Sequence, residues 1–205
     1  MIKPIIIKVF FIIVIIFFLI GLFTPMVVIK KKGKDPHGTH KGASLLTRLT
    51  PFTIFTWLIF IIIFIINHKV ILHFLPVEML ISDFFIIMGF IIIIIGLILD
   101  SWGTIALGTN FRIELPKEEI SLITNGIYRV MRNPIVMGVY LLLFGSFLII
   151  PTILSLIFFI ANVLTFASKI RDEERFLTKR FGEEYKKYCA KVGRYFPFSI
   201  IKTKR

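Results

Sequence analysis

Apolar residues fill five long stretches of this chain, and the polar residues gather almost entirely between and after them. The apolar runs cover residues 4–29, 52–67, 83–99, 134–150 and 152–168. A helix needs about 20 such residues to cross a hydrocarbon core of about 30 Å, and each run reaches or approaches that length. The pattern predicts an all-α integral membrane protein with about five transmembrane helices.

A single proline separates the last two runs. Proline cannot continue a helix, and Pro151 leaves no room for a loop, so these two runs are predicted to form a tight antiparallel helical hairpin. Each would be about 25 Å long as a helix, which barely covers the hydrocarbon core. Asn162, inside the second of them, is predicted to make a hydrogen bond to a neighbouring helix.

The segment after the last run has a helical period of its own. Phe181, Tyr185, Tyr188 and Val192 recur at spacings of four, three and four, which places them on one face of a basic helix. Such a face suits either the membrane interface or the surface of the helix bundle. The prediction is a cytoplasmic amphipathic helical tail.

Composition supports the membrane class and argues against a soluble fold. Hydrophobic residues make up 57% of the 205, and the mean hydropathy is +0.89. Soluble domains contain about 45–50% apolar residues, and a soluble fold of this size would expose large apolar patches.

The net charge of +13 is arranged as a topology signal. Segments 30–50, 101–133 and 169–205 hold six, four and twelve of the 25 basic residues, and five spans would place all three on one side. The positive-inside rule then puts the N-terminus outside and the C-terminus in the cytoplasm, with the basic residues near anionic lipid headgroups. Nucleic acid is not expected as a partner, because aromatic residues do not interleave with these basic clusters.

The chain divides into two functional parts on this basis. Residues 1–100 are predicted to form three N-terminal transmembrane helices with a basic loop. Residues 101–205 contain the re-entry loop, the hairpin and the tail, and almost every residue capable of chemistry.

The loop before the fourth run has the features of an anion site. Asn133-Pro134 reads as a helix N-cap followed by the first helical residue, and Arg132 stands beside it. Backbone N–H groups, the helix dipole and a guanidinium together suit a small carboxylate or phosphate. The alternative is an ordinary interfacial helix start, with Arg132 reaching to lipid headgroups.

Three consecutive acidic residues, 172–174, follow the fifth run, although the chain has only 12 acidic residues. Glu173 and Glu174 could hold a ligand's ammonium group or ribose hydroxyls, or balance a sulfonium. The alternative is a salt-bridged helix in which they pair with basic neighbours three or four residues away. Those neighbours are Lys169, Arg171 and Arg175.

Several short motifs occur in a fixed order around the proline-broken hairpin. They are Leu107-Gly108, Gly126-Ile127-Tyr128, Arg132-Asn133-Pro134 with Gly138, Glu173-Glu174, Phe181-Gly182-Glu183-Glu184-Tyr185 with Tyr188, and Gly193-Arg194-Tyr195-Phe196-Pro197. From about residue 96 to 197 the chain therefore resembles the membrane methyltransferases that include isoprenylcysteine carboxyl methyltransferases and phospholipid N-methyltransferases. Residues before this region match only as membrane spans.

The resemblance implies an S-adenosylmethionine (SAM) dependent methyltransferase acting on a membrane-embedded lipid or lipidated substrate. The cofactor-binding residues it implies are Tyr128, Arg132, Asn133, Pro134, Glu173 and Glu174. The candidate catalytic residues are Glu173, Glu174 and Arg171, and no metal site is expected. Two positions depart from the family pattern: Asn133 stands where many members have histidine, and Val136 where tyrosine is common.

The sequence does not decide the chemical group that accepts the methyl group, and it leaves the role of Asp100 open as well. Transfer to a prenylcysteine-like carboxylate and transfer to a phospholipid amine are both compatible with the motifs. Alternatives from other classes are a non-catalytic lipid-binding membrane protein and a sterol-reductase-like oxidoreductase. Asp100 ends the third run, where it could cap the helix, pair with Arg112 or line the substrate entrance.

Overall fold

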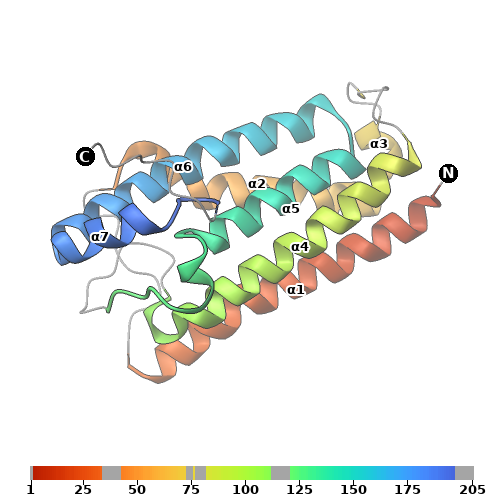
Figure 1. Ribbon diagram of the computed structural model, residues 1–205. Helices are drawn as coiled ribbons and strands as arrows, with labels where there is room; N and C mark the ends of the chain where they lie inside the picture. The colour runs from red at the N-terminus through yellow and green to blue at the C-terminus, as the bar shows by residue number, and fades with distance from the viewer. Residues whose placement is uncertain (1, 34–42, 73–75, 77–81, 112–120, 197–205) are drawn as a thin grey trace.

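The computed structural model describes residues 2–33, 43–72, 76, 82–111 and 121–196, and these are helical throughout, without a β-sheet (Figure 1). The α-helices are α1 (Pro4–Lys31), α2 (Leu45–Ile66), α3 (His68–Leu72), α4 (Asp83–Leu107), α5 (Pro134–Ile149), α6 (Ile153–Phe181) and α7 (Glu183–Lys191). Two short 3-10 helices follow α4 and precede α5, namely η2 (Gly108–Asn110) and η3 (Gly126–Arg129).

Four of these helices, α1, α2, α4 and α6, are long and apolar enough to cross a membrane. The all-helical prediction is confirmed for the described residues, and the four apolar helices make this an integral membrane protein. Helix α5 is apolar but has only 16 residues, or about 24 Å at 1.5 Å per residue.

Three helices extend further than the apolar runs predicted. Helix α2 begins at Leu45 instead of near residue 52, α4 continues to Leu107 instead of stopping near residue 99, and α6 runs to Phe181 instead of ending near residue 168. The predicted ends were wrong because they followed hydropathy. A helix continues into polar sequence as long as nothing breaks its backbone hydrogen bonds, and here Gly108 and Gly182, both with positive φ, stop α4 and α6.

All the segments expected to carry chemistry meet at one end of the bundle. Helices α1 and α4 run toward that end, α5 starts there, and α6 and α7 close over it, while the N-terminus lies at the opposite end (Figure 1). The described parts of the three basic segments therefore share one end, as the charge pattern predicted.

The predicted hairpin at Pro151 is present, and residues 150–152 form the whole connection between α5 and α6. Thr152 and Ser155 cap α6 reciprocally, and the Ser155 hydroxyl donates to the Ile150 carbonyl at 2.6 Å. However, the two helices pack mainly on other partners: α5 on α4, and α6 on α2. Asn162 makes the predicted interhelical contact, because it accepts a hydrogen bond from the Thr53 hydroxyl at 2.9 Å.

Glycines set the distance between α4 and α5. A Cβ added to Gly96 would lie 2.7 Å from the Gly138 carbonyl oxygen, and one added to Gly145 would lie 2.8 Å from the Gly89 carbonyl oxygen. Only glycine permits this approach, which is the usual way that membrane helices pack closely. At the end of this contact where α5 begins, Gly103 faces Pro134, so the start of α5 is fixed against α4.

Asp172 attaches α6 to the start of α2. Its side chain is 2% exposed, and it accepts hydrogen bonds from the Ser44 backbone N–H at 2.8 Å and the Thr47 hydroxyl at 2.5 Å. Arg175 pairs with its other oxygen at 2.9 Å. The first acidic residue of the 172–174 run is therefore structural.

The tail helix α7 turns back onto the bundle after Gly182. The predicted apolar face exists, but Phe181 belongs to the end of α6, because the chain breaks at Gly182. Tyr185 and Val192 are buried and Tyr188 is half-buried. The sequence left two environments open for this apolar face, the membrane interface and the surface of the helix bundle. In the structure the face packs on the helix bundle.

Candidate active site

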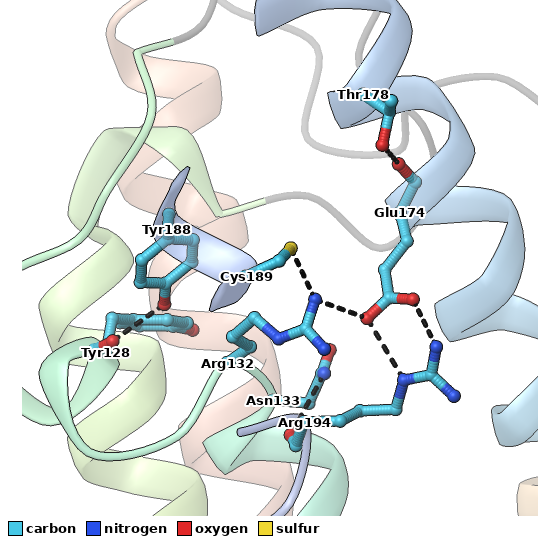
Figure 2. A network of polar contacts seen from close by, with 8 residues as sticks. All are labelled: Tyr128, Arg132, Asn133, Glu174, Thr178, Tyr188, Cys189 and Arg194. Atoms are coloured by element: carbon cyan, nitrogen blue, oxygen red, sulfur yellow. Dashed lines mark hydrogen bonds and ion pairs between the residues drawn. The ribbon is translucent and has the colours of Figure 1, made fainter. Parts of the chain in front are cut away.

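Arg132 lies at the centre of a polar network at the end of the bundle where α5 begins (Figure 2). The short helix η3 and the buried Pro134 at the first position of α5 fix the backbone on either side of it. The Arg132 side chain is 8% exposed, and its Nη1 lies 3.0 Å from Glu174 Oε1 and 2.6 Å from Cys189 Sγ. Helices α6 and α7 therefore both contribute to the surroundings of one guanidinium.

Glu174 of α6 bridges two arginines. Its Oε1 accepts hydrogen bonds from Arg132 and, at 3.0 Å, from Arg194 Nε, while its Oε2 pairs with Arg194 Nη2. The Arg194 fork therefore binds the carboxylate with two parallel contacts, a geometry that favours strong and directional pairing. The hydrogen bond to Glu174 also raises the pKa of Arg194.

The chain after α7 is held against the loop before α5. Gly193 forms a parallel bridge with Met131 and accepts a hydrogen bond from the Arg132 backbone N–H at 2.9 Å. Asn133 precedes α5 as predicted, but its side chain does not cap the helix. Instead, its amide donates to the Arg194 carbonyl at 3.2 Å, because the returning chain offers an acceptor at that place.

Two tyrosines connect η3 to its neighbours. The Tyr188 hydroxyl donates to the Tyr128 carbonyl at 2.6 Å, and the Tyr128 hydroxyl donates to the Gly103 carbonyl of α4 at 3.4 Å. Burial is the first cause that raises the pKa of each phenol, so both hydroxyls stay protonated and act as donors. Tyr128 and Tyr188 thus form a hydrogen-bonded pair beside the network around Arg132 (Figure 2).

The three acidic residues of α6 diverge, because successive helical residues point about 100° apart. Asp172 faces α2, as described above, and Glu174 faces Arg132. Glu173 is 35% exposed and pairs with Lys169 at 3.7 Å. Arg171 is exposed and lies on the rim of an open hollow. Of the predicted site residues, the structure brings together Arg132, Asn133 and Glu174, and it leaves Glu173 and Arg171 beside them.

The network has the properties of a carboxylate-binding site. Within the described part of the chain, the buried Arg132 Nε has no hydrogen-bond partner, so an anionic oxygen would satisfy it. The hollow beside Glu174 has a volume of about 550 Å³. Its lining residues are Arg171, Glu174, Arg175, Thr178 and Lys179. The site therefore offers both cationic and anionic groups to a zwitterionic ligand.

Sequence reasoning assigned no part of the site to three residues that lie at or beside it: Tyr188, Cys189 and Arg194. Arg194 stands in a motif that carries the family resemblance, but 20 residues separate it from Glu174. A signal was present nonetheless, because an acidic residue at a basic membrane face needs a cation, and one arginine can satisfy only part of a carboxylate.

One known protein family matches the part of the chain that contains Arg132 and Glu174. The family described as Phospholipid methyltransferase matches residues 84–184, from the start of α4 to the first turn of α7. This segment, just under half of the chain, is similar to that family of membrane methyltransferases. It contains Arg132 and Glu174, whereas Arg194 lies just beyond it.

Individual relatives carry a related name. The chain is 34% identical over 115 residues to "Probable protein-S-isoprenylcysteine O-methyltransferase" of Oryza sativa subsp. indica, a match that covers 54% of this chain and 60% of the relative. It is 33% identical over 114 residues to "Protein-S-isoprenylcysteine O-methyltransferase B" of Arabidopsis thaliana, covering 54% and 58%. The yeast protein of the same type, from Saccharomyces cerevisiae, is 37% identical over 78 residues, covering 38% and 33%. The chain thus spans 60% or less of the length of each of these relatives.

Proposed function

We propose that this protein is a SAM-dependent methyltransferase acting on a membrane-embedded lipid or lipidated substrate. The observation that carries the proposal is the network in which the buried Arg132 and the exposed Arg194 both pair with Glu174, in and beside a segment that matches the family. A purely lipid-binding protein gains nothing from a buried arginine with an unused donor. A sterol-reductase-like activity has no support from the relatives, which are named as methyltransferases.

Different residues of the site would bind different parts of SAM. Arg132 would hold the carboxylate with its unused Nε, and Glu174 would face the ammonium. Tyr128, Asn133 and Pro134 would shape the pocket by fixing the loop before α5. Glu173 would contact the ribose or a proton of the acceptor, and Arg171 would guide the ligand at the rim.

Bound SAM supplies a methyl group on a sulfonium, which is already a strong electrophile. The protein therefore has to align the acceptor and exclude water rather than activate the methyl group. A carboxylate acceptor needs no general base. An amine acceptor must lose a proton, for which Glu173 is the candidate because its carboxylate is partly exposed.

The acceptor is proposed to reach the site from the bilayer. The name of the relatives favours a prenylcysteine acceptor, and the name of the family favours a phospholipid. In either case the apolar part of the substrate would stay among the lipid chains, and only the polar head would enter between the helices. No large aqueous cavity is then required.

The number of membrane spans and the sides on which the two termini lie are part of the same proposal. Five spans, with α5 as the short fourth, place the N-terminus outside and the C-terminus in the cytoplasm. Residues 1–100 then serve as the helical support, residues 101–205 as the catalytic part, and the basic segments contact anionic lipid headgroups. Single cysteines introduced at positions 40 and 200 should both react with reagents applied from the cytoplasmic side. Labelling of the two positions from opposite sides would contradict this topology.

The activity itself is tested with purified protein, host membranes and SAM labelled in its methyl group. Label should appear in an organic-extractable lipid or lipidated product, and protein with Arg132→Ala should transfer far less. Label confined to small water-soluble products would exclude the lipid substrate while leaving methyl transfer intact. Binding of NADPH without binding of SAM would favour the reductase instead.

A further inference from the structure

Asp100 is a buried carboxylate in the apolar part of α4 that the network around Glu174 does not use. It is 8% exposed, and among the described residues it forms neither a hydrogen bond nor an ion pair. Arg112, its sequence-predicted partner, lies outside the described residues. A carboxylate in such surroundings is strongly unfavourable without a partner, and ionisable residues at membrane depth usually mark a functional site.

Two glycines flank this carboxylate. A Cβ on Gly138 of α5 would lie 2.9 Å from the Asp100 Cβ, so α5 closes one side of the residue. A Cβ on Gly21 of α1 would lie 3.7 Å from Asp100 Oδ2, with no other atom within 4 Å. Gly21 therefore leaves space for about one methyl group beside the carboxylate, on the side that faces α1.

Tyr128 connects this position to the proposed SAM site. Its hydroxyl donates to the carbonyl of Gly103, which lies one helical turn from Asp100 toward the end of α4. Burial first, and then the charges of Glu173, Tyr188 and Asp100, raise the pKa of the Tyr128 phenol. The phenol therefore lies within electrostatic reach of both Asp100 and Glu173.

We propose that Asp100 binds the ammonium group of the methyl acceptor and so selects an amine-bearing lipid over a carboxylate-bearing one. This inference rests on the proposed function and narrows its substrate class. An ammonium group would supply the missing countercharge, whereas a carboxylate acceptor would meet a like charge at low dielectric. Asp100 lies about 10 Å inside the end of α4, a depth that a lipid headgroup reaches while its chains stay in the bilayer.

The test uses the full chain in phosphatidylglycerol nanodiscs, which contain no cationic headgroup. They are doped with phosphatidylethanolamine or with its N-acetylated form, in which an uncharged amide that carries an acetyl group replaces the ammonium group. With labelled SAM, Asp100→Asn should raise the KM for phosphatidylethanolamine about tenfold, the effect of losing a hydrogen bond to a charged group, while the Kd for SAM stays within about twofold. Asp83→Asn, the same change at the other end of α4, is the matched control and should leave KM unchanged.

A second measurement does not require methyl transfer. Phosphatidylethanolamine should raise the Tm of the wild-type protein above the value with the N-acetylated lipid, and Asp100→Asn should abolish that difference. Should Asp100→Asn fail to fold, Asp100→Glu, which keeps the charge, should preserve the difference. If the Tm difference is absent from the wild-type protein, or survives in Asp100→Asn, Asp100 is not an ammonium site. If the Tm difference behaves as expected but no acceptor is methylated, the proposed function fails and the ammonium site stands.

Discussion

Replacing Arg132 by alanine is expected to weaken SAM binding by about 1.5–3 kcal/mol, or roughly ten- to 150-fold in Kd. The reason is that its guanidinium is 8% exposed, is already oriented by Glu174, and has one donor, Nε, that no described residue engages. The substitution would also leave Glu174 with only Arg194 as a countercharge. Isothermal titration calorimetry on detergent-purified protein measures the change directly.

Arg129→Ala is the matched control for this measurement. Arg129 lies in η3, three residues before Arg132, and is exposed. Its loss should change SAM affinity by less than twofold, because an exposed arginine outside the network contributes little. Equal SAM affinities for Arg132→Ala and the wild-type protein would show that the carboxylate of SAM binds elsewhere.

Replacing Asp172 by alanine is expected to lower the free energy of unfolding by roughly 2–4 kcal/mol. The side chain accepts hydrogen bonds from the Ser44 N–H and the Thr47 hydroxyl, so its removal leaves two partly buried donors without their acceptor. It also frees the start of α2 from α6. Thermal unfolding of the purified protein in a fixed detergent measures the loss.

Glu173→Ala provides the comparison at the next residue. Glu173 is 35% exposed, and its contact with Lys169 at 3.7 Å is a half-buried pair within one helix, so its loss should change stability by no more than about 1 kcal/mol. If the two variants lost equal stability, the distinct structural role assigned to Asp172 would be incorrect. An unchanged stability of Asp172→Ala would have the same consequence.

The choice of methyl acceptor would depend on Asp100, which neither Arg132→Ala nor Asp172→Ala alters. On the proposed function, Arg132 and Glu174 would bind the methyl donor and so serve any acceptor, whereas Asp100 would meet only the substrate head. A chain whose relatives are named for a carboxyl acceptor could thus differ in acceptor through one buried charge. The nanodisc experiment separates these contributions, because SAM affinity and lipid selectivity are measured independently.

The sequence alone determined the class of this protein, because that class depends on local properties. Long apolar runs predict membrane helices whatever their neighbours are, and Pro151 and the Asn133-Pro134 pair mark helix ends by their own backbone chemistry. The same holds for the shared end of the basic segments, which follows from alternation of the spans. The motifs around Arg132 and Glu174 were also readable, since their residue types and order are fixed along the chain.

Only the tertiary structure decided which other helices most of the charged residues contact, whereas the pairing of Glu173 with Lys169, four residues away, was one of the sequence alternatives. Asp172, Glu173 and Glu174 are adjacent in sequence, yet the helix turns them toward α2, Lys169 and Arg132 respectively. Arg194 reaches Glu174 across 20 residues because α7 folds back over the bundle. On the side of Asp100 that faces α5, the glycine contact at Gly138 brings the two helices too close for another side chain to enter. The surroundings of Arg194 and Asp100 depend on long-range packing between helices, whereas the divergence of the three acidic residues follows from the helical period.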